Sequence, residues 1–350
     1  MKAFFNLSQR GQIIRLRKLA NAALQRYDIG EVSLRFLSNT DNSVFCVDRT
    51  TEKSQQIENP NAPSRYILRI TRPEKYPPKV IRDELLWLST LRTQANLVVP
   101  EPVLAADGTF VQEVSVAGVP QPRHCVLFRW IHGRFRNHDL LTPKELERVG
   151  SFIARLHRHA EMFVLPDKFE RPRLDEAILL GENTILCPGV GDRFFSRRDL
   201  SVFDTGIREL CTQMGQIGKS SEVFGMIHGD CQPANFLFHG RNVHFIDFSD
   251  CGLGYYLYDC VPTLSYLRHR PDFQAQWCAF FNGYQKVKVL PVDYKAQFET
   301  FTALRTVFLV NWVCNWPNPV YQTWGENFLK ESVMRIKHYL QHGWVPLQFS

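Results

Sequence analysis

Three side chains that can handle a phosphate and a metal ion occur close together in one short stretch of the sequence. Asp230 follows a His-Gly pair, Asn235 comes five residues later, and Asp247 lies near the end of the next apolar run. The β-prone runs Phe236–Phe238 and Val243–Phe248 are separated by His-Gly-Arg-Asn, which is typical of a β-hairpin. Such a hairpin brings Asn235, at the start of the first strand, beside Asp247, at the end of the second.

This arrangement predicts a site for phosphoryl transfer. A carboxylate and an amide oxygen at neighbouring strand ends can hold Mg²⁺, which prefers oxygen ligands and keeps several waters. Asp230, on the loop just before the hairpin, would lie over that ion as a base. A base-like Asp, a metal-binding Asn and a metal-binding Asp in this order are the parts of a protein-kinase-type phosphotransferase. The alternative is a hairpin with ordinary turn residues.

The segment HGDCQPANFLF…FIDFSD resembles the catalytic segment of the aminoglycoside phosphotransferase/choline kinase family, which shares a two-lobed fold with protein kinases. The resemblance implies that Asp230 is the catalytic base and that Asn235 and Asp247 bind Mg²⁺. It also implies structural roles for two further residues: His228 would brace the loop, and Asp259 would fasten the backbone of the catalytic loop.

Composition indicates a globular protein with room for about two domains. The chain has 350 residues, of which 44% are hydrophobic and 22% are charged. No run of 18 apolar residues is present, and the N-terminus has no signal-peptide pattern, so we expect no membrane span. The nine cysteines are scattered without a C-x2-C pair, which indicates reduced thiols and a cytoplasmic protein.

The net charge of +7 does not by itself indicate nucleic-acid binding. No five consecutive residues are Lys or Arg, and the usual nucleic-acid motifs are missing from the sequence. We therefore expect a dispersed, solvated basic surface with a local positive pocket for ATP. The oligomeric state stays unknown at this stage.

A hairpin near the N-terminus is a candidate cover for the phosphates of a nucleotide. Residues 32–37 and 44–47 are predicted strands, with a polar turn between them. Because the turn has no G-x-G-x-x-G, its backbone N–H groups and the side chains of Ser38, Thr40 and Asn42 would contact phosphate. The turn resembles the S-x-x-x-N turns of distant family members, although an ordinary polar turn explains it equally well.

The strand Tyr66–Ile70 carries Arg69 where kinases have the lysine that pairs with phosphate and with a glutamate on the next helix. Glu84, on the following predicted helix, is the expected partner of Arg69, and Asp83 is the competing candidate. Arginine is not equivalent to lysine, because its planar fork favours bidentate contacts. The alternative is that Arg69 is a surface residue on an edge strand.

The strand that ends in Arg-Trp-Ile, at residues 129–131, resembles the hinge between the lobes of a kinase. By this resemblance, adenine would hydrogen-bond to backbone groups near Arg129 and Ile131. Backbone recognition requires no particular side chain, so a buried strand explains this segment equally well.

Together these features predict an α+β, two-lobed protein-kinase-like fold, with a small β-rich N-lobe (1–128), a hinge (129–131) and a larger, mainly helical C-lobe (132–350). ATP and Mg²⁺ would bind in the cleft. The predicted function is transfer of the γ-phosphoryl group to a hydroxyl of a small molecule, such as an amino alcohol, a sugar or an antibiotic. Two alternatives remain: a Ser/Thr protein kinase of the bacterial stress-response type, which the stretch R-P-E-K-Y resembles, and a nucleotide-binding protein without catalysis.

Overall fold

The computed structural model describes residues 3–50, 64–72, 75–315 and 322–346, so Pro73 and Glu74 of the R-P-E-K-Y stretch lie outside the described residues. The chain divides into two compact units, Met1–His132 with Pro166–Glu170, and Gly133–Leu165 with Arg171–Ser350. Residues 166–170 belong to the first unit although the flanking residues belong to the second, and the sequence did not predict this. There the backbone N–H of Glu170 donates a hydrogen bond of 2.7 Å to Asp83.

The first unit is an antiparallel sheet with two long helices. The sheet order is β1-β2-β3-β5-β4, which places β3 between two neighbours. Its elements are η1 (Phe4–Asn6), α1 (Gln9–Leu24), β1 (Val32–Asn39), β2 (Asn42–Arg49), β3 (Arg65–Thr71), α2 (Pro78–Gln94), β4 (Gln112–Val114) and β5 (Arg123–Arg129).

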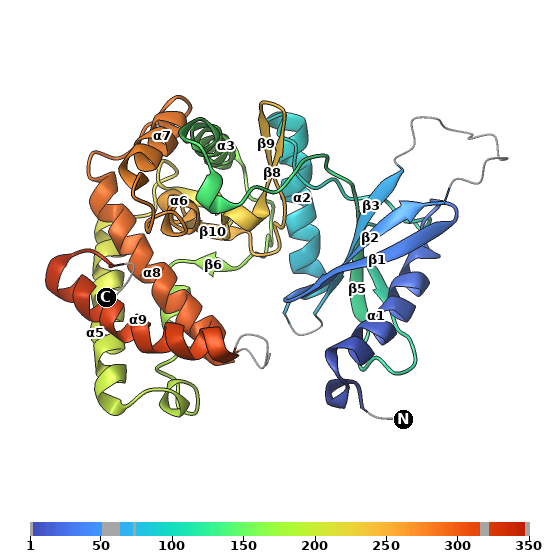
Figure 1. The fold of residues 1–350 in the computed structure, drawn as a ribbon, viewed down its shortest axis with the longest axis horizontal. Helices are drawn as coiled ribbons and strands as arrows, with labels where there is room; N and C mark the ends of the chain where they lie inside the picture. Colours follow the sequence, from blue (N-terminus) through green and yellow to red (C-terminus); the bar gives the residue numbers. More distant parts are fainter. Residues whose placement is uncertain (1–2, 51–63, 73–74, 316–321, 347–350) are drawn as a thin grey trace. The chain divides into compact units, whose positions relative to one another are not determined.

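Helix α1 covers one face of this sheet (Figure 1). Leu16, Leu19 and Ala23 recur at helical spacing and are buried against sheet residues such as Phe45 and Leu68. Ser8 caps the helix by accepting a hydrogen bond from the backbone N–H of Gly11. The hydrophobic core of the first unit therefore lies between α1 and the sheet.

The second unit is mainly helical, as the sequence predicted. Its long helices are α3 (Pro143–Met162), α5 (Arg197–Ile217), α6 (Tyr256–Ser265), α7 (Phe273–Gln285), α8 (Tyr294–Asn315) and α9 (Gln322–His342). Its short elements are η2 (His138–Leu140), β6 (Arg173–Leu174), α4 (Ala177–Leu180), η3 (Gly191–Arg193), β7 (Phe224–Ile227), η4 (Pro233–Asn235), β8 (Phe236–His239), β9 (Asn242–Phe245) and β10 (Gly252–Tyr255).

Helices α3 and α7 lie side by side in the second unit (Figure 1). Their backbones approach closely at two glycines. A Cβ on Gly150 would lie 2.0 Å from the carbonyl oxygen of Phe280, and one on Gly283 would lie 1.8 Å from that of Glu147. Any side chain at either position would force the two helices apart. Helix α3 also carries the buried His157 and packs against β9.

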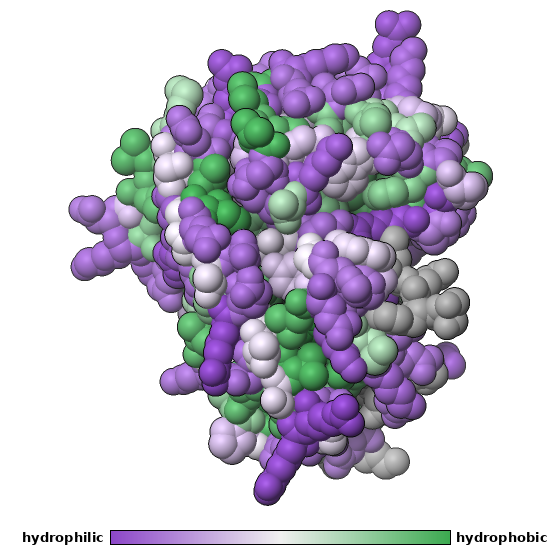
Figure 2. All heavy atoms as spheres, turned by 90° about the vertical axis from the view of Figure 1, so that its left-hand side faces the viewer, coloured by the Kyte–Doolittle hydropathy of each residue, from purple (hydrophilic) through white to green (hydrophobic). Residues whose placement is uncertain are grey.

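No described helix has both the length and the hydrophobicity needed to cross a membrane. Hydrophilic residues cover most of the face shown in Figure 2, with smaller hydrophobic patches between them. The nine cysteines, which all lie in the described parts of the chain, are free thiols.

Candidate active site

A hairpin of β8 and β9 carries the candidate metal ligands. Phe236 pairs with Phe245, and the N–H of Ile246 donates to the carbonyl oxygen of Asn235 at 3.1 Å. Asn235, the last residue of η4, and Asp247, two residues beyond β9, therefore lie at the same end of the hairpin. The predicted neighbourhood of these two residues is thus present in the structure.

The second strand is shorter than predicted. It ends at Phe245, not Phe248, and Asp247 has a φ of +61°, which lies outside the extended region that regular strand residues occupy. The turn exposes Asp247 and lets its Oδ1 accept a hydrogen bond of 2.8 Å from the Ser249 hydroxyl. Arg171 stabilises the loop that follows Asp247. Its guanidinium donates hydrogen bonds to the carbonyl oxygens of Ser249 and Cys251, at 2.7 Å each. The sequence did not indicate a role for Arg171.

Asp230 receives hydrogen bonds on both carboxylate oxygens. Its Oδ2 accepts from Gln232 Nε2 at 2.7 Å and from Asn235 Nδ2 at 3.0 Å. Asn235 Nδ2 also donates to the carbonyl oxygen of Asp230 at 2.9 Å. Because the amide nitrogen of Asn235 is turned to Asp230, its Oδ1 is directed away from Asp230. The amide oxygen of Asn235 and the carboxylate of Asp247 form an oxygen donor set that fits Mg²⁺.

Arg305, on α8, is a functional candidate that sequence reasoning missed. Its Nη2 donates to Asp230 Oδ1 at 2.6 Å, and its Nη1 lies 3.2 Å from both the Gly229 carbonyl oxygen and the Tyr258 hydroxyl. Burial by itself lowers the pKa of this guanidinium, but Tyr258 and Asp230 outweigh that effect and raise it. Arg305 is therefore a permanent cation beside the candidate base.

The buried Asp259, in the first turn of α6, holds the backbone that leads to Asp230. Its two carboxylate oxygens accept from the N–H groups of His228 and Gly229, at 2.7 Å each, and His157 Nε2 lies 3.2 Å from Oδ2. Burial opposes the charge on this carboxyl, but His157 and the His228 N–H lower its pKa below the usual value. The pKa of His157 is lowered by burial, although Asp259 opposes that shift.

His228 connects the loop before Asp230 to the hairpin. The N–H of Asp230 donates to its Nδ1 at 3.2 Å, so Nε2 carries the proton and donates to the Ile246 carbonyl oxygen at 3.1 Å. Gly229 between them has a φ of +82°, and a Cβ there would lie 2.5 Å from the Asp250 carbonyl oxygen. His228 is therefore needed for its two hydrogen bonds, and Gly229 for its positive φ and its close approach to the Asp250 backbone.

In the first unit, Arg69 and Glu84 form a buried, bidentate ion pair. The two Nη atoms of Arg69 lie 2.7 and 2.9 Å from the two carboxylate oxygens of Glu84. The side chains are 8% and 1% exposed. Asp83 instead pairs with Lys79 at 2.5 Å. Since β3 is an interior strand, the structure contradicts the alternative of an exposed edge residue. The phosphate contact of Arg69 stays a prediction.

The hairpin of β1 and β2 has a tighter turn than the sequence indicated. The strands include Ser38, Asn39 and Asn42, so only Thr40 and Asp41 remain between them. Ser38 lies opposite Val44 after an irregularity in the pairing, and Asn42 is buried at the start of β2. Polar side chains at the strand ends hydrogen-bond to each other. The Ser43 hydroxyl donates to Asn39 Oδ1 at 2.6 Å. Phosphate binding by Ser38 and Asn42 stays a prediction.

In the expected hinge, two backbone N–H groups already donate hydrogen bonds within the first unit. The N–H of Arg129 donates to the Glu101 carbonyl oxygen at 2.9 Å, and the N–H of Trp130 donates to that of Arg65 at 3.2 Å. The Arg129 guanidinium also pairs with the Glu101 carboxylate. The N–H of Arg129 is thus engaged within the first unit, and Ile131 is the better candidate for an adenine contact.

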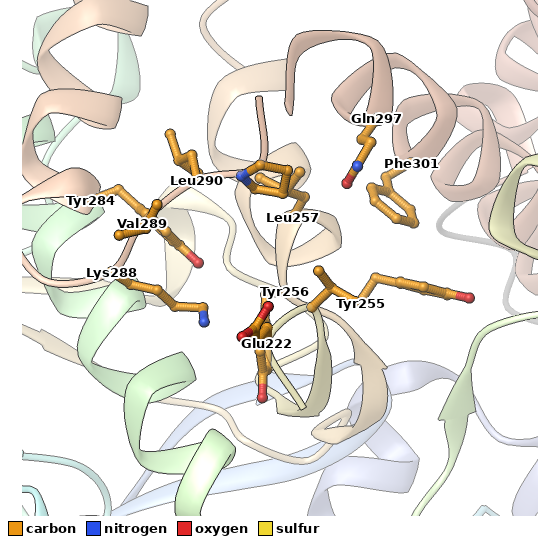
Figure 3. A pocket seen from close by; sticks show the side chains of 12 residues that line it. Glu222, Tyr255, Tyr256, Leu257, Tyr284, Lys288, Val289, Leu290, Gln297 and Phe301 are labelled. Atoms are coloured by element: carbon orange, nitrogen blue, oxygen red, sulfur yellow. The ribbon is translucent and has the colours of Figure 1, made fainter. Parts of the chain in front are cut away.

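A separate pocket of the second unit lies between the start of α6 and the connection from α7 to α8 (Figure 3). Tyr255, Tyr256, Tyr284 and Lys288 contribute to its lining, and the Lys288 ammonium lies 4.8 Å from the centre of the Tyr256 ring. No residue of the predicted active site lines this pocket.

Comparison with known proteins identifies the family and the fold of the chain. The model of a family described as "Phosphotransferase enzyme family" matches residues 35–290. No curated protein sequence matches the chain. Among solved structures, a microcompartment-associated aminopropanol kinase is 27% identical with a TM-score of 0.77, over 95% of this chain and 100% of its own.

Two further structures have the same fold. The amicoumacin kinase hAmiN, solved with AMP-PNP, Ca²⁺ and Ami, is 19% identical with a TM-score of 0.73, over 93% of this chain and 96% of its own. A choline kinase from Cryptosporidium parvum Iowa II is 14% identical with a TM-score of 0.59, over 93% and 94%.

Proposed function

Because this chain belongs to the phosphotransferase enzyme family, we propose that it transfers the γ-phosphoryl group of ATP to a hydroxyl group of a small molecule. The observation that carries the proposal is the arrangement of Asp230, Asn235 and Asp247 around one hairpin end. An acidic base beside an oxygen donor set for Mg²⁺ is what this reaction requires.

In the proposed reaction, Asp230 accepts a hydrogen bond from the acceptor hydroxyl and takes its proton as the phosphorus–oxygen bond to that hydroxyl forms. The bond between the γ-phosphorus and the bridging oxygen breaks, and ADP leaves. Asn235 and Asp247 hold Mg²⁺, which supplies neutralisation of charge on the phosphate oxygens. Arg69, fixed by Glu84, adds positive charge toward phosphate. Most of the rate enhancement then comes from positioning and electrostatics.

An amino alcohol is the acceptor class that we propose first. It rests on the aminopropanol kinase, which is the only one of the three structures described above with more than a quarter of its residues identical. An antibiotic acceptor is the second candidate, because the amicoumacin kinase has the same fold over nearly its whole length. A sugar and a protein substrate are kept as outcomes of the test.

The test is ADP release from Mg-ATP by the purified chain with amino alcohols, sugars, aminoglycosides and a generic protein, with Asp230→Asn as the blank. The proposal expects a response to a small hydroxyl compound that Asp230→Asn abolishes while ATP binding is retained. A response to protein alone would support the protein-kinase alternative. ATP binding without turnover on any acceptor would support the binding-only alternative. A response that survives in Asp230→Asn would contradict the assignment of the base.

A further inference from the structure

Three side chains of the second unit, outside the candidate active site, converge as a group that can bind a metal ion. His269 Nε2 lies 2.8 Å from Asp139 Oδ1, and His138 Nε2 lies 3.5 Å from the same oxygen. One ligand atom from each side chain lies within 4.8 Å of the other two. Within the described ranges, this is the only such group of three or more His, Cys, Asp or Glu residues. The side chains are 37–49% exposed, so an ion can reach them from solvent.

Hydrogen bonds to the backbone hold the two segments of this group together. Arg270, next to His269, donates through Nη1 to the carbonyl oxygens of His138 and Leu141, at 2.9 and 3.1 Å. Asp272 fixes the guanidinium by accepting two further hydrogen bonds from it, at 2.8 and 2.9 Å. The Asn137 side chain accepts from the N–H of Asp139 at 3.0 Å. The ligands are therefore brought together by the fold before any ion binds.

The donor types select the class of ion. Two imidazole nitrogens and one carboxylate oxygen suit Zn²⁺ and other divalent transition metals, whereas Mg²⁺ prefers oxygen alone. Tetrahedral Zn²⁺ with ligand bonds of about 2.0–2.1 Å has its ligand atoms roughly 3.3 Å apart. The separations of 2.8 and 3.5 Å from Asp139 lie on either side of this value. We propose that His138, Asp139 and His269 bind a divalent transition metal such as Zn²⁺, with water as a fourth ligand.

This metal site is connected to the catalytic loop through two side chains. The His138 ring contacts the Tyr266 ring edge-on, with 5.6 Å between the centroids. The Tyr266 hydroxyl donates to Gln232 Oε1 at 3.0 Å, and Gln232 Nε2 donates to Asp230 Oδ2 at 2.7 Å. An ion that fixes His138 also restrains Tyr266, which positions Gln232. The metal site stands on its own geometry and does not depend on the proposed kinase activity.

The test is calorimetric titration of the metal-free full chain with Zn²⁺, together with the visible absorption of bound Co²⁺. The titration contains excess Mg²⁺ and no nucleotide. The Mg²⁺ occupies the oxygen ligands near Asp247, so that Zn²⁺ does not bind there. We expect one Zn²⁺ per chain. His269→Ala and His138→Ala should each weaken Zn²⁺ binding at least roughly 10-fold and remove the Co²⁺ spectrum. The thermal unfolding of each variant shows that it is folded.

The matched control is His338→Ala on α9, because the half-buried His338 and the exposed His342 form a pair with 4.3 Å between ring centroids and offer only two ligands. This variant should bind Zn²⁺ as the unchanged chain does. Three results would overturn the proposal: no Zn²⁺ binding by the unchanged chain, equal binding by all variants (adventitious surface binding only), or loss of binding in His338→Ala alone.

Discussion

The Nη2 atom of Arg305 lies 2.6 Å from Oδ1 of Asp230, and both side chains are only 15% exposed. Asp230 therefore has a cation on one carboxylate oxygen, while Gln232 and Asn235 donate to the other. These three hydrogen bonds fix the orientation of the Asp230 carboxylate. We infer that Asp230, the proposed base, is positioned before the acceptor binds, and that Arg305 acts through Asp230 as a positioning residue.

Arg305→Gln tests this relationship. Without the ion pair, Asp230 can rotate away from the position that accepts the proton, and we expect kcat to fall by roughly 100-fold. The KM for ATP should change little, because Arg305 contacts Asp230, Gly229 and Tyr258. Steady-state kinetics with the best acceptor from the panel would measure both values.

Arg305→Lys should recover part of kcat, since an ammonium keeps the charge but cannot span the same three partners. Arg208→Gln is the matched control, because Arg208 is exposed and pairs only with Asp204 one helical turn away among the contacts described. An increase of kcat in Arg305→Gln would mean that Arg305 competes with the acceptor for Asp230, and would contradict the positioning role.

Asp247→Asn separates the charge of the proposed Mg²⁺ site from the backbone conformation of Asp247. Asp247 has a φ of +61°, and asparagine tolerates this left-handed region as well as aspartate does. The substitution therefore removes one negative charge without a backbone cost. We expect the Mg²⁺-dependent affinity for ATP to fall by more than roughly 10-fold in calorimetric titration. Asp250→Asn, which neutralises another carboxylate of the same loop, is the control. An unchanged affinity in Asp247→Asn would exclude Asp247 as a ligand.

The residues that could be predicted from sequence are those whose contacts follow from local periodicity. Asn235 and Asp247 are brought together by a hairpin, whose strands and turn are signalled by adjacent residues. Arg69 and Glu84 belong to a strand and the next helix, so the register of two neighbouring elements determines their pair. The early end of β9 could not be predicted, because nothing in the run VHFIDF signals the positive φ of Asp247.

Arg305 and Arg171 could not be assigned partners from sequence for a different reason. Each contacts a segment about 75 to 80 residues away, so the contact depends on how whole elements pack. The signal for Arg305 was a single charge in the apolar segment ALRTVF of α8, which fits a buried ion pair but does not identify the partner. Likewise, the approach of His138 and Asp139 to His269 depends on backbone hydrogen bonds from Arg270.

Arg69 is expected to contribute both to stability and to ATP binding. Arg69→Met leaves the Glu84 carboxylate, which is 1% exposed, without the two hydrogen bonds from its partner. Loss of one partner of a buried ion pair should lower the free energy of unfolding by about 3–5 kcal/mol. Arg69→Lys should retain kcat and change the KM for ATP by less than about 10-fold, since one ammonium still neutralises Glu84 and faces phosphate.

Urea unfolding and the KM for ATP would be measured for both variants of Arg69. Arg65→Lys on the same strand is the control, because Arg65 is 43% exposed and pairs with Asp48 at the sheet surface. Arg69→Met with unchanged stability would contradict the structural role of the pair. A lower stability with unchanged KM for ATP would confine Arg69 to that structural role.

Asp259 and His157 predict how stability depends on pH. The pKa of His157 is lowered from 6.5 by burial, so the unfolded chain binds a proton there before the folded one does. The stabilisation from the neutral His157 is therefore complete above pH 6.5 and is lost as pH falls toward its folded pKa. The pKa of Asp259 is lowered from 3.8, so its stabilisation is complete above that pH and is lost only as pH falls further.

Asp259→Asn should lower the free energy of unfolding at pH 7 by about 1–3 kcal/mol, because the N–H groups of His228 and Gly229 lose their charged acceptor. It should also remove the share of the stability loss below pH 3.8 that comes from Asp259, while the decline that begins near pH 6.5 remains, since His157 still has to be protonated in a buried position. Urea unfolding at pH 7, 5 and 3 would measure both effects, with the exposed Asp204→Asn as the control. If Asp259→Asn kept the full loss of stability below pH 3.8, that loss would come from other carboxylates. Asp259 would then stabilise the catalytic loop without making its stability depend on pH.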